Sequence, residues 1–327
     1  MAAVAPLLLD RVFDDPAAIE DLLVRHAPYW NQVRYTPAGT RAAAATMPAG
    51  HPFALEGGAP PLFRGDWLQW PQQVDGVTEL VEAPVLLDGA RRLFDGASAA
   101  PTFLYVNLTA PMPQVDAGHV DVPSFRGLTR PETPGWLLLA MHRSGLFERW
   151  AVRTATAVVW FYEGLGGQLR YWPDGPAGPS ALADPVPNTA IVGDNDNMFH
   201  RVEAIGDPEL WRAVPRTSEL HHAGGDRWEI RDGDTTVATY RFDQLRVSLS
   251  WKAAVALDDA EVRRLRWEAD VAVAGTSDRL ALEQAVRTLI EALSERGHWD
   301  GRPATVEDPA FVEAVMATWP RAVPPVS

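Results

Sequence analysis

The chain has 327 residues, of which 46% are hydrophobic and 22% charged, so it can bury a sizeable core and is expected to be globular. It has no cysteine, which excludes disulfides, zinc–thiolate sites, iron–sulfur clusters and thiol nucleophiles. Any bound metal must therefore take His, Asp, Glu or carbonyl ligands. The formal net charge of −14 argues against a nucleic-acid partner, because phosphate binding needs a basic surface.

The sequence predicts neither a signal peptide nor a membrane span. The apolar run in MAAVAPLLLDRVFDD has no basic segment before it, and acidic residues follow at once. No apolar stretch reaches the ~20 residues that cross a bilayer. We therefore expect a cytoplasmic protein with no membrane partner.

The first third of the chain is expected to combine helices with irregular structure. A helix is predicted from Pro16 over AAIEDLLVRHA, where apolar residues recur at helical spacing, and another begins at Pro84 in PVLLDGARRLF. Between them, Thr36 to Trp70 is rich in glycine, proline and aromatic residues without a clear period. Long irregular segments of this kind are often binding loops or lids.

From Thr102 the sequence is typical of β-structure. Strands are predicted in residues 102–110, 154–164, 166–175, 188–197, 199–206 and 244–257, and a hairpin in 227–242 around Asp232-Gly233. Few helices separate these strands, a pattern that predicts an antiparallel barrel or jelly roll.

Helices are expected to flank the strands. They are predicted over residues 134–150, 258–272, 277–297 (capped by Ser277 and ended by Gly297) and 309–319. The expected fold is mainly β with flanking helices, in one compact catalytic domain. Its parts are a helical and loop region (1–101), a jelly-roll core (102–257) and C-terminal helices (258–327).

Two residues that can bind a metal lie two positions apart, His119 and Asp121 in GHVD. In an extended segment such residues project to the same face. His200, in DNDNMFHRV, is a candidate third ligand from another strand. Two histidines and one carboxylate with open positions opposite them select iron(II) in oxygenases. The sequence therefore predicts an iron site on His119, Asp121 and His200.

A second motif lies in LRVSLSW, where Arg246 and Ser248 are two positions apart and should face the same way. An arginine on such a strand can make a bidentate pair with a carboxylate, and the hydroxyl of Ser248 can hydrogen-bond to the same group.

Together, GHVD, GGQLRYWP, DNDNMFHRV and LRVSLSW resemble, in this order, the motifs of the iron(II)- and 2-oxoglutarate-dependent oxygenases. The resemblance covers residues 102–257 and implies a double-stranded β-helix, a jelly roll of the cupin type. It implies that His119, Asp121 and His200 bind Fe(II), and that Arg246 and Ser248 hold the distal carboxylate of 2-oxoglutarate. The implied enzyme is a dioxygenase that consumes 2-oxoglutarate and O2, releases succinate, and oxidises a C–H bond by hydroxylation or a related step such as ring closure.

The chain departs from the family pattern in one spacing. The family's arginine usually follows the second histidine more closely than Arg246 follows His200, so the resemblance implies an insertion at about residues 206–243. Arg212 and Arg216 lie nearer the usual distance and are rivals, but their surroundings lack strand character. Because Asp121 is present, halogenation, which occurs in relatives without this carboxylate, is not expected.

Further site residues are predicted by their position. Asn107 and Tyr105 precede the metal motif on a strand, where they could contact 2-oxoglutarate or be ordinary strand residues. Gln114 and Arg126 bracket the motif and are expected to line its mouth. The remaining candidates for substrate binding, all in the irregular segment, are Glu56, Asp66 and Trp67.

Two other classes of protein stay open: a cupin-like metal-binding sugar isomerase and a non-catalytic jelly-roll binding module. Neither needs a carboxylate clamp at Arg246 and Ser248. The expected partner is a small-molecule substrate. The acidic charge and 13 tryptophans suit a cationic natural product, such as an amino sugar or a basic amino-acid derivative modified in antibiotic biosynthesis.

Overall fold

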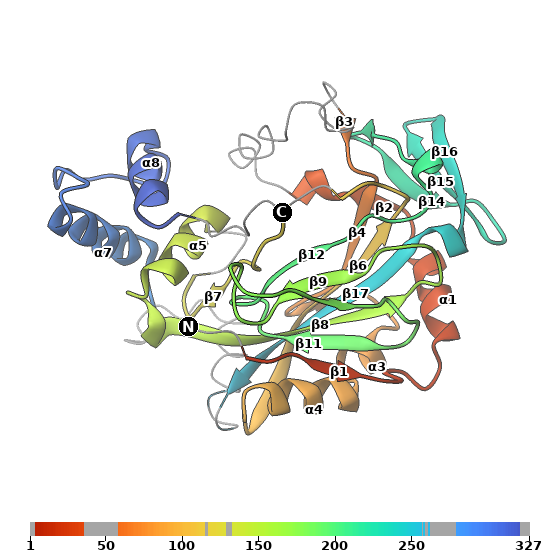
Figure 1. Ribbon diagram of the computed structural model, residues 1–327, viewed down its shortest axis with the longest axis horizontal. Helices are drawn as coiled ribbons and strands as arrows, with labels where there is room; N and C mark the ends of the chain where they lie inside the picture. Colours follow the sequence, from red (N-terminus) through yellow and green to blue (C-terminus); the bar gives the residue numbers. More distant parts are fainter. Residues whose placement is uncertain are drawn as a thin grey trace.

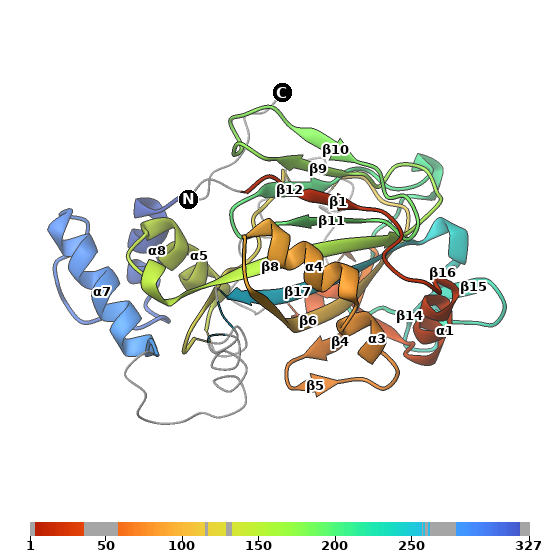
Figure 2. The ribbon, with the colours of Figure 1, turned by 90° about the horizontal axis from the view of Figure 1, so that it is seen from below.

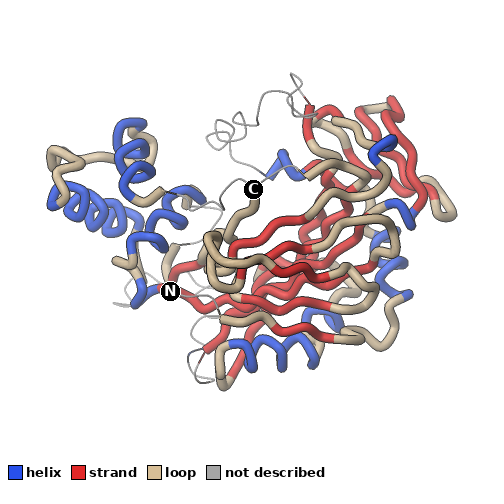
Figure 3. The backbone as a smooth tube through the Cα atoms, in the orientation of Figure 1, coloured by secondary structure: helices blue, strands red, loops and turns tan. Residues whose placement is uncertain are grey.

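The computed structural model describes residues 4–35, 58–114, 117–128, 133–256, 258, 261 and 279–320. Antiparallel strands fill the centre of the molecule and helices lie around them (Figures 1 and 3). Within these ranges, no helix combines the length and the apolar character that crossing a lipid bilayer requires.

The large sheet is antiparallel throughout and runs across the whole core. Its strand order is β1 (Leu7–Leu9), β11 (Ala190–Gly193), β8 (Ala151–Phe161), β17 (Arg246–Ala256), β6 (Ser98–Thr109), β4 (Leu62–Gln69), β2 (Tyr29–Asn31), β14 (Glu219–His222), β15 (Arg227–Asp232) and β16 (Thr235–Arg241), while β5 (Gln72–Gln73) pairs with β4 and β7 (Ser124–Phe125) with β8. A separate short pair joins β3 (Gly58–Ala59) to β13 (Val214–Pro215).

A smaller sheet forms a second layer over the large one (Figure 2), in the order β10 (Ala181–Ala183), β9 (Leu169–Trp172) and β12 (Phe199–Val202). The segment before the metal motif runs beside β12, because Met112 bridges to Ile205 and His119 to His200. Along the chain, β6, β8, β11 and β17 of the large sheet therefore alternate with strands of the small one. This alternation defines the predicted jelly roll.

Strand β17 pairs with β6 on one side and β8 on the other, and every one of its residues is buried. Because side chains alternate along a strand, its two faces differ. One face carries Val247, Leu249, Trp251 and Ala253, which belong to the main hydrophobic core. The other carries Arg246, Ser248, Ser250 and Lys252, and it faces the small sheet.

Two groups of helices pack on this framework. Helices α1 (Ala17–Arg25), α3 (Thr78–Val81) and α4 (Pro84–Leu93) contribute to the main core, with α4 against β6, β8, β11 and β17 of the large sheet. Helices α5 (Gly135–Ser144), α7 (Leu282–Glu295) and α8 (Pro309–Thr318) form a second core to one side of the sheets (Figure 1).

Most elements expected from the sequence are confirmed. Each predicted strand from Thr102 onward contains an observed strand, and residues 227–242 form the hairpin of β15 and β16. The helices predicted from Pro16, from Pro84, over 134–150 and over 309–319 correspond to α1, α4, α5 and α8.

The structure adds to or differs from the expectations for residues 36–70, 206–243 and 277–297. The prediction of irregular structure from Thr36 to Trp70 is wrong in its second half, where β4 pairs with β6 along most of its length; residues 36–57 lie outside the described part of the chain. Helix α7 begins at Leu282, later than predicted, and Ser277 and most of 258–272 are also outside the described part. Within 206–243, β14, β15 and β16 extend the large sheet through β2.

The face of β17 that packs into the main core is expected to contribute strongly to the stability of the fold. Leu249→Ala should lower the free energy of unfolding by about 2–5 kcal/mol, because Leu249 is fully buried in the main core. The control is Leu182→Ala, at a half-exposed leucine of β10, which should change it by less than about 0.5 kcal/mol. Denaturant unfolding followed by circular dichroism measures both, and equal losses would contradict the face assignment.

Candidate functional site

His119 and His200 face each other across neighbouring strands. The amide N–H of each donates to the carbonyl oxygen of the other at 2.8 Å, so they form a directly opposed antiparallel pair. Directly opposed residues carry their side chains on the same face of a sheet, and here the ring centroids are 4.6 Å apart. Strand pairing therefore brings together two imidazoles that are distant in sequence.

Asp121 completes a three-residue cluster. Its amide N–H donates to the carbonyl oxygen of Asn195 at 2.8 Å, which ties it to the turn before β12. One ligand atom from each of His119, Asp121 and His200 lies within 4.8 Å of the others, the one such metal-binding group among the described residues. Two imidazole nitrogens and a carboxylate oxygen, without a thiolate, fit a divalent ion such as Fe(II).

The ring of His200 is fixed in the form that can bind a metal. Its Nδ1 lies 2.9 Å from the carbonyl oxygen of Met198; because a carbonyl only accepts, Nδ1 carries the proton and Nε2 keeps its lone pair. Burial, reinforced by the neighbouring His119, lowers the pKa of His200 to about 4. The imidazole is therefore neutral at pH 7.

The carboxylate of Asp121 is paired with a lysine from the large sheet. Nζ of Lys252 donates to Oδ2 of Asp121 at 2.7 Å. Burial alone would raise the pKa of Asp121, but Lys252 and the two histidines outweigh it and hold the pKa below its usual range. We did not expect Lys252 from the sequence, although it continues the period of two set by Arg246 and Ser248.

Helix α5 supports the turn that leads into β12. Nε2 of His142 donates to Oδ1 of Asn197 at 2.9 Å, and Nδ2 of Asn197 donates to Oδ2 of Asp194 at 2.9 Å. Burial lowers the pKa of His142 and raises that of Asp194. This network holds the turn whose Asn195 carbonyl binds the amide of Asp121, so it links the helix to the metal-binding cluster.

Arg246 places a cation inside the jelly roll. Its Nε donates to the carbonyl oxygen of Gly167 at 2.8 Å and its Nη1 to Oγ of Ser248 at 3.2 Å. Its Nη2 is buried and has no hydrogen-bond partner among the described residues. No carboxylate in this part of the chain forms an ion pair with Arg246. Burial lowers the pKa of Arg246 to about 10, so it is still protonated at neutral pH.

Gly167 makes room for this arginine. Its φ is +75°, and a Cβ at this position would lie 2.8 Å from Cδ and 3.1 Å from Nε of Arg246. A side chain would therefore be strained and would push the guanidinium away.

Tyr105 and Asn107 lie on the same face as the polar residues of β17. Tyr105 is directly opposite Ser250, and Nδ2 of Asn107 donates to Oγ of Ser250 at 3.3 Å. On the next strand, Arg64 lies over the ring of Tyr105 at 3.8 Å and pairs with Asp66, opposite Tyr105, at 2.6 Å. The predicted residues Tyr105, Asn107 and Asp66 therefore share one half-buried surface.

Other predicted residues are placed elsewhere or undefined. Trp67 is buried in the main hydrophobic core, so the structure does not bring it to the face of Asp66. The guanidinium of Arg126 donates to the carbonyl oxygen of Arg149, beside the second core. Gln114 is half-buried in the segment before His119, and Glu56 lies outside the described residues.

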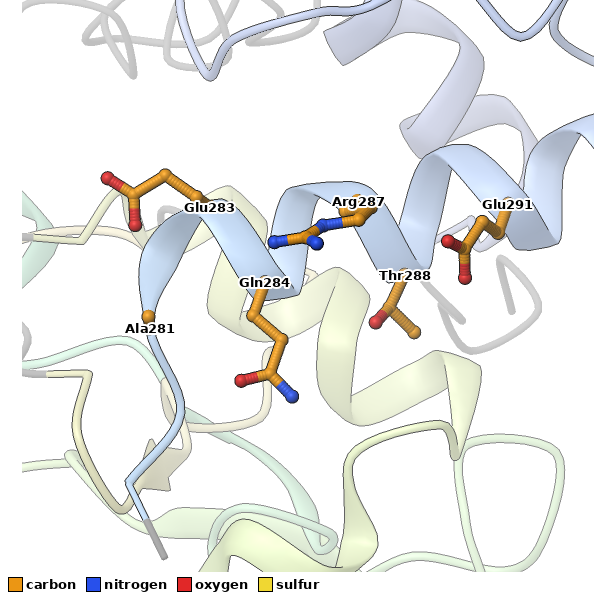
Figure 4. A pocket seen from close by; sticks show the side chains of 6 residues that line it. All are labelled: Ala281, Glu283, Gln284, Arg287, Thr288 and Glu291. Carbon is orange, nitrogen blue, oxygen red and sulfur yellow. The ribbon is translucent and has the colours of Figure 1, made fainter. Parts of the chain in front are cut away.

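A shallow hollow on α7 lies outside the jelly roll (Figure 4). It is lined by residues of one helix and its flank, namely Ala281, Glu283, Gln284, Arg287, Thr288 and Glu291. None of its side chains is fully buried, and it contains no histidine. We assign it no role.

No protein-family model and no curated protein sequence matches the chain. Similar solved structures include an oxidoreductase of the 2OG-Fe(II) oxygenase family from Burkholderia pseudomallei (13% identity, 77% of this chain, 86% of that chain, TM-score 0.40). A second is a Pseudomonas putida prolyl-4-hydroxylase (14% identity, 77% of this chain, 93% of that chain, TM-score 0.37). A third is HygX from Streptomyces hygroscopicus with nickel, 2-oxoglutarate and hygromycin B bound (8% identity, 77% of this chain, 83% of that chain, TM-score 0.38). All three TM-scores are below 0.5, so we argue function from the chain's own residues.

The ion pair between Asp121 and Lys252 is expected to stabilise the metal-free protein. Asp121→Ala should lower the free energy of unfolding by about 3–5 kcal/mol, because it leaves the charge of Lys252 buried without this partner. Asp243→Ala, which breaks an exposed pair with Arg241, is the control and should cause no measurable change. Urea unfolding in the presence of a chelator gives both values. Equal effects would mean that the Asp121 pair adds nothing to the fold.

Proposed function

We propose that the chain is an iron(II)- and 2-oxoglutarate-dependent oxygenase that acts on a small molecule. The observation that carries the proposal is Arg246, a buried cation in the same jelly roll as the metal-binding cluster, whose terminal Nη2 group has no hydrogen-bond partner among the described residues. Burying an unpaired cation costs stability, so its presence favours a role in binding an anion. 2-Oxoglutarate has such an anion at one end and a metal-chelating keto acid at the other.

His119, Asp121 and His200 would hold the iron. Three protein donors would leave further positions on the ion for the keto acid and for oxygen. Iron with 2-oxoglutarate and O2 supplies the oxidation of a substrate C–H bond, and the protein supplies position and a site shielded from water. The Met198 carbonyl and Lys252 orient two of the three ligands.

The spacing along β17 suits a ligand with two ends. Lys252, which contacts Asp121, and Ser248, which contacts the guanidinium of Arg246, are four residues apart on one face of the strand. At about 3.3 Å per residue their backbones are separated by roughly 13 Å. The metal-binding cluster and the arginine are thus contacted from two levels of the same face of β17, an arrangement that favours a ligand with an acid group at each end.

The positions of the rival arginines support Arg246 as the anchor. Arg212 and Arg216 are exposed and flank β13, which pairs with β3 outside the large sheet, whereas Arg246 is buried on β17. A sugar isomerase or a binding module would have the jelly roll and could have the metal, but it has no need of this buried cation beside Ser248.

The test is binding of 2-oxoglutarate to protein loaded with Ni(II). Arg246→Ala should weaken binding by on the order of 2–4 kcal/mol, because a charge-assisted contact in a buried site is lost. This corresponds to about 30- to 1,000-fold in Kd. Arg212→Ala and Arg216→Ala are the controls and should stay within about twofold of the wild type. The opposite ranking in calorimetric titrations would refute Arg246 as the anchor.

We further propose that the substrate lies on the half-buried surface of Tyr105, Asn107 and Asp66, and that it is a cationic natural product of the kind expected from the sequence. Asp66 stands directly opposite Tyr105, which is itself opposite Ser250 on β17. With strands about 4.8 Å apart, this surface begins next to the metal-binding face. A cationic group would compete with Arg64 for the carboxylate of Asp66.

Asp66→Asn tests this placement, because it keeps the shape of the side chain and removes its charge. With a panel of amino sugars and basic amino-acid derivatives, any compound that stimulates succinate release should show a several-fold higher KM in the variant. Asp88→Asn, an exposed aspartate of α4, is the matched control. An unchanged KM in Asp66→Asn would exclude a substrate contact at this carboxylate.

A further inference from the structure

Lys252 is the one lysine of the chain; every other basic residue counted with it is an arginine. It is buried in the middle of the large sheet, on the polar face of β17. Its ammonium group reaches across to Asp121, with Nζ 2.7 Å from Oδ2. The chain therefore has its single lysine in contact with the single carboxylate of the metal-binding cluster.

A second donor approaches the same oxygen. Thr156 of β8 is directly opposite Lys252 in the strand pairing, and its hydroxyl lies 3.5 Å from Oδ2 of Asp121. Two neighbouring strands of the large sheet thus direct hydrogen-bond donors at Oδ2. Neither contact involves Oδ1 of the same carboxylate.

The choice of lysine has a chemical consequence. An ammonium group is a compact charge that can engage one carboxylate oxygen, whereas a guanidinium is a planar fork that matches both oxygens at once. At this position an arginine would compete with the metal for the whole carboxylate. A lysine leaves one oxygen available.

We propose that Lys252 is a positioning residue that holds Asp121 by Oδ2, so that the carboxylate gives the metal one oxygen only. A carboxylate bound through both oxygens would occupy one more position on the ion. Lys252 thereby preserves the open positions that the co-substrate and oxygen need. The inference rests on the metal site of the proposed function, but it does not depend on 2-oxoglutarate as the co-substrate.

The test is a titration with Co(II) in the absence of 2-oxoglutarate. Lys252→Arg keeps the positive charge but offers a fork, and it should weaken Co(II) binding by about tenfold or more, the scale found when groups behind metal ligands are changed. Thr154→Val, which removes another buried hydroxyl of β8 without a contact to Asp121, should stay within twofold. Wild-type affinity in Lys252→Arg would overturn the proposal.

A crystal structure of the Co(II)-loaded wild type covers the case in which the variant does not fold. The expected result is one oxygen of Asp121 on cobalt and the other on Nζ of Lys252. Both oxygens on cobalt would overturn the proposal. Failure of the oxygenase assignment would look different: the wild type would bind Co(II) with this geometry, but the same protein loaded with Fe(II) would release no succinate from 2-oxoglutarate.

Discussion

Strand β17 is buried on both faces, and the alternation of its side chains separates the core from the site. Val247, Leu249 and Trp251 pack into the main core, while Arg246 and Lys252 project toward the small sheet. A shift of one residue in its register would bury the charges in the core and place the apolar side chains in the site. Long pairings with β6 and β8 hold that register.

The metal-binding cluster depends on this same two-layer arrangement. His200 lies on β12 of the small sheet and His119 pairs with it from the neighbouring segment, while the large sheet supplies Lys252, which contacts the carboxylate of Asp121. Arg246, the anion-binding residue of the proposed function, comes from the same strand as the lysine, so β17 sets the distance between Arg246 and the metal-binding cluster. Helix α5 adds support through the Asn197 network.

The sequence predicted those parts of the site in which two side chains lie two positions apart on an extended segment. The spacing of His119 and Asp121 indicated a common face, as did that of Arg246 and Ser248, and the structure places each pair as the pattern requires. The partner of a strand is not encoded locally, however, so the opposed pairing of His119 with His200 could be expected only through the family resemblance. The contact between Lys252 and Asp121 joins β17 to the segment after His119 and could not be predicted from spacing alone.

Strand β4 was missed for a different reason. The segment around it is rich in glycine, proline and aromatic residues and was expected to be irregular, although Phe63, Gly65 and Trp67 alternate with Arg64 and Asp66 as a strand requires. Arg64 and Asp66 are tolerated in this strand because they pair with each other on a half-buried face beside Tyr105, so the usual preference for apolar strand residues is overridden.

Succinate formation from 2-oxoglutarate by the wild-type protein in air, with Fe(II) added or removed by a chelator, decides whether the protein is an oxygenase of this kind. We predict release of succinate that depends on iron and that is lost in His200→Ala. Wild-type protein that binds Fe(II) and 2-oxoglutarate but forms no succinate, with or without candidate substrates, would contradict it.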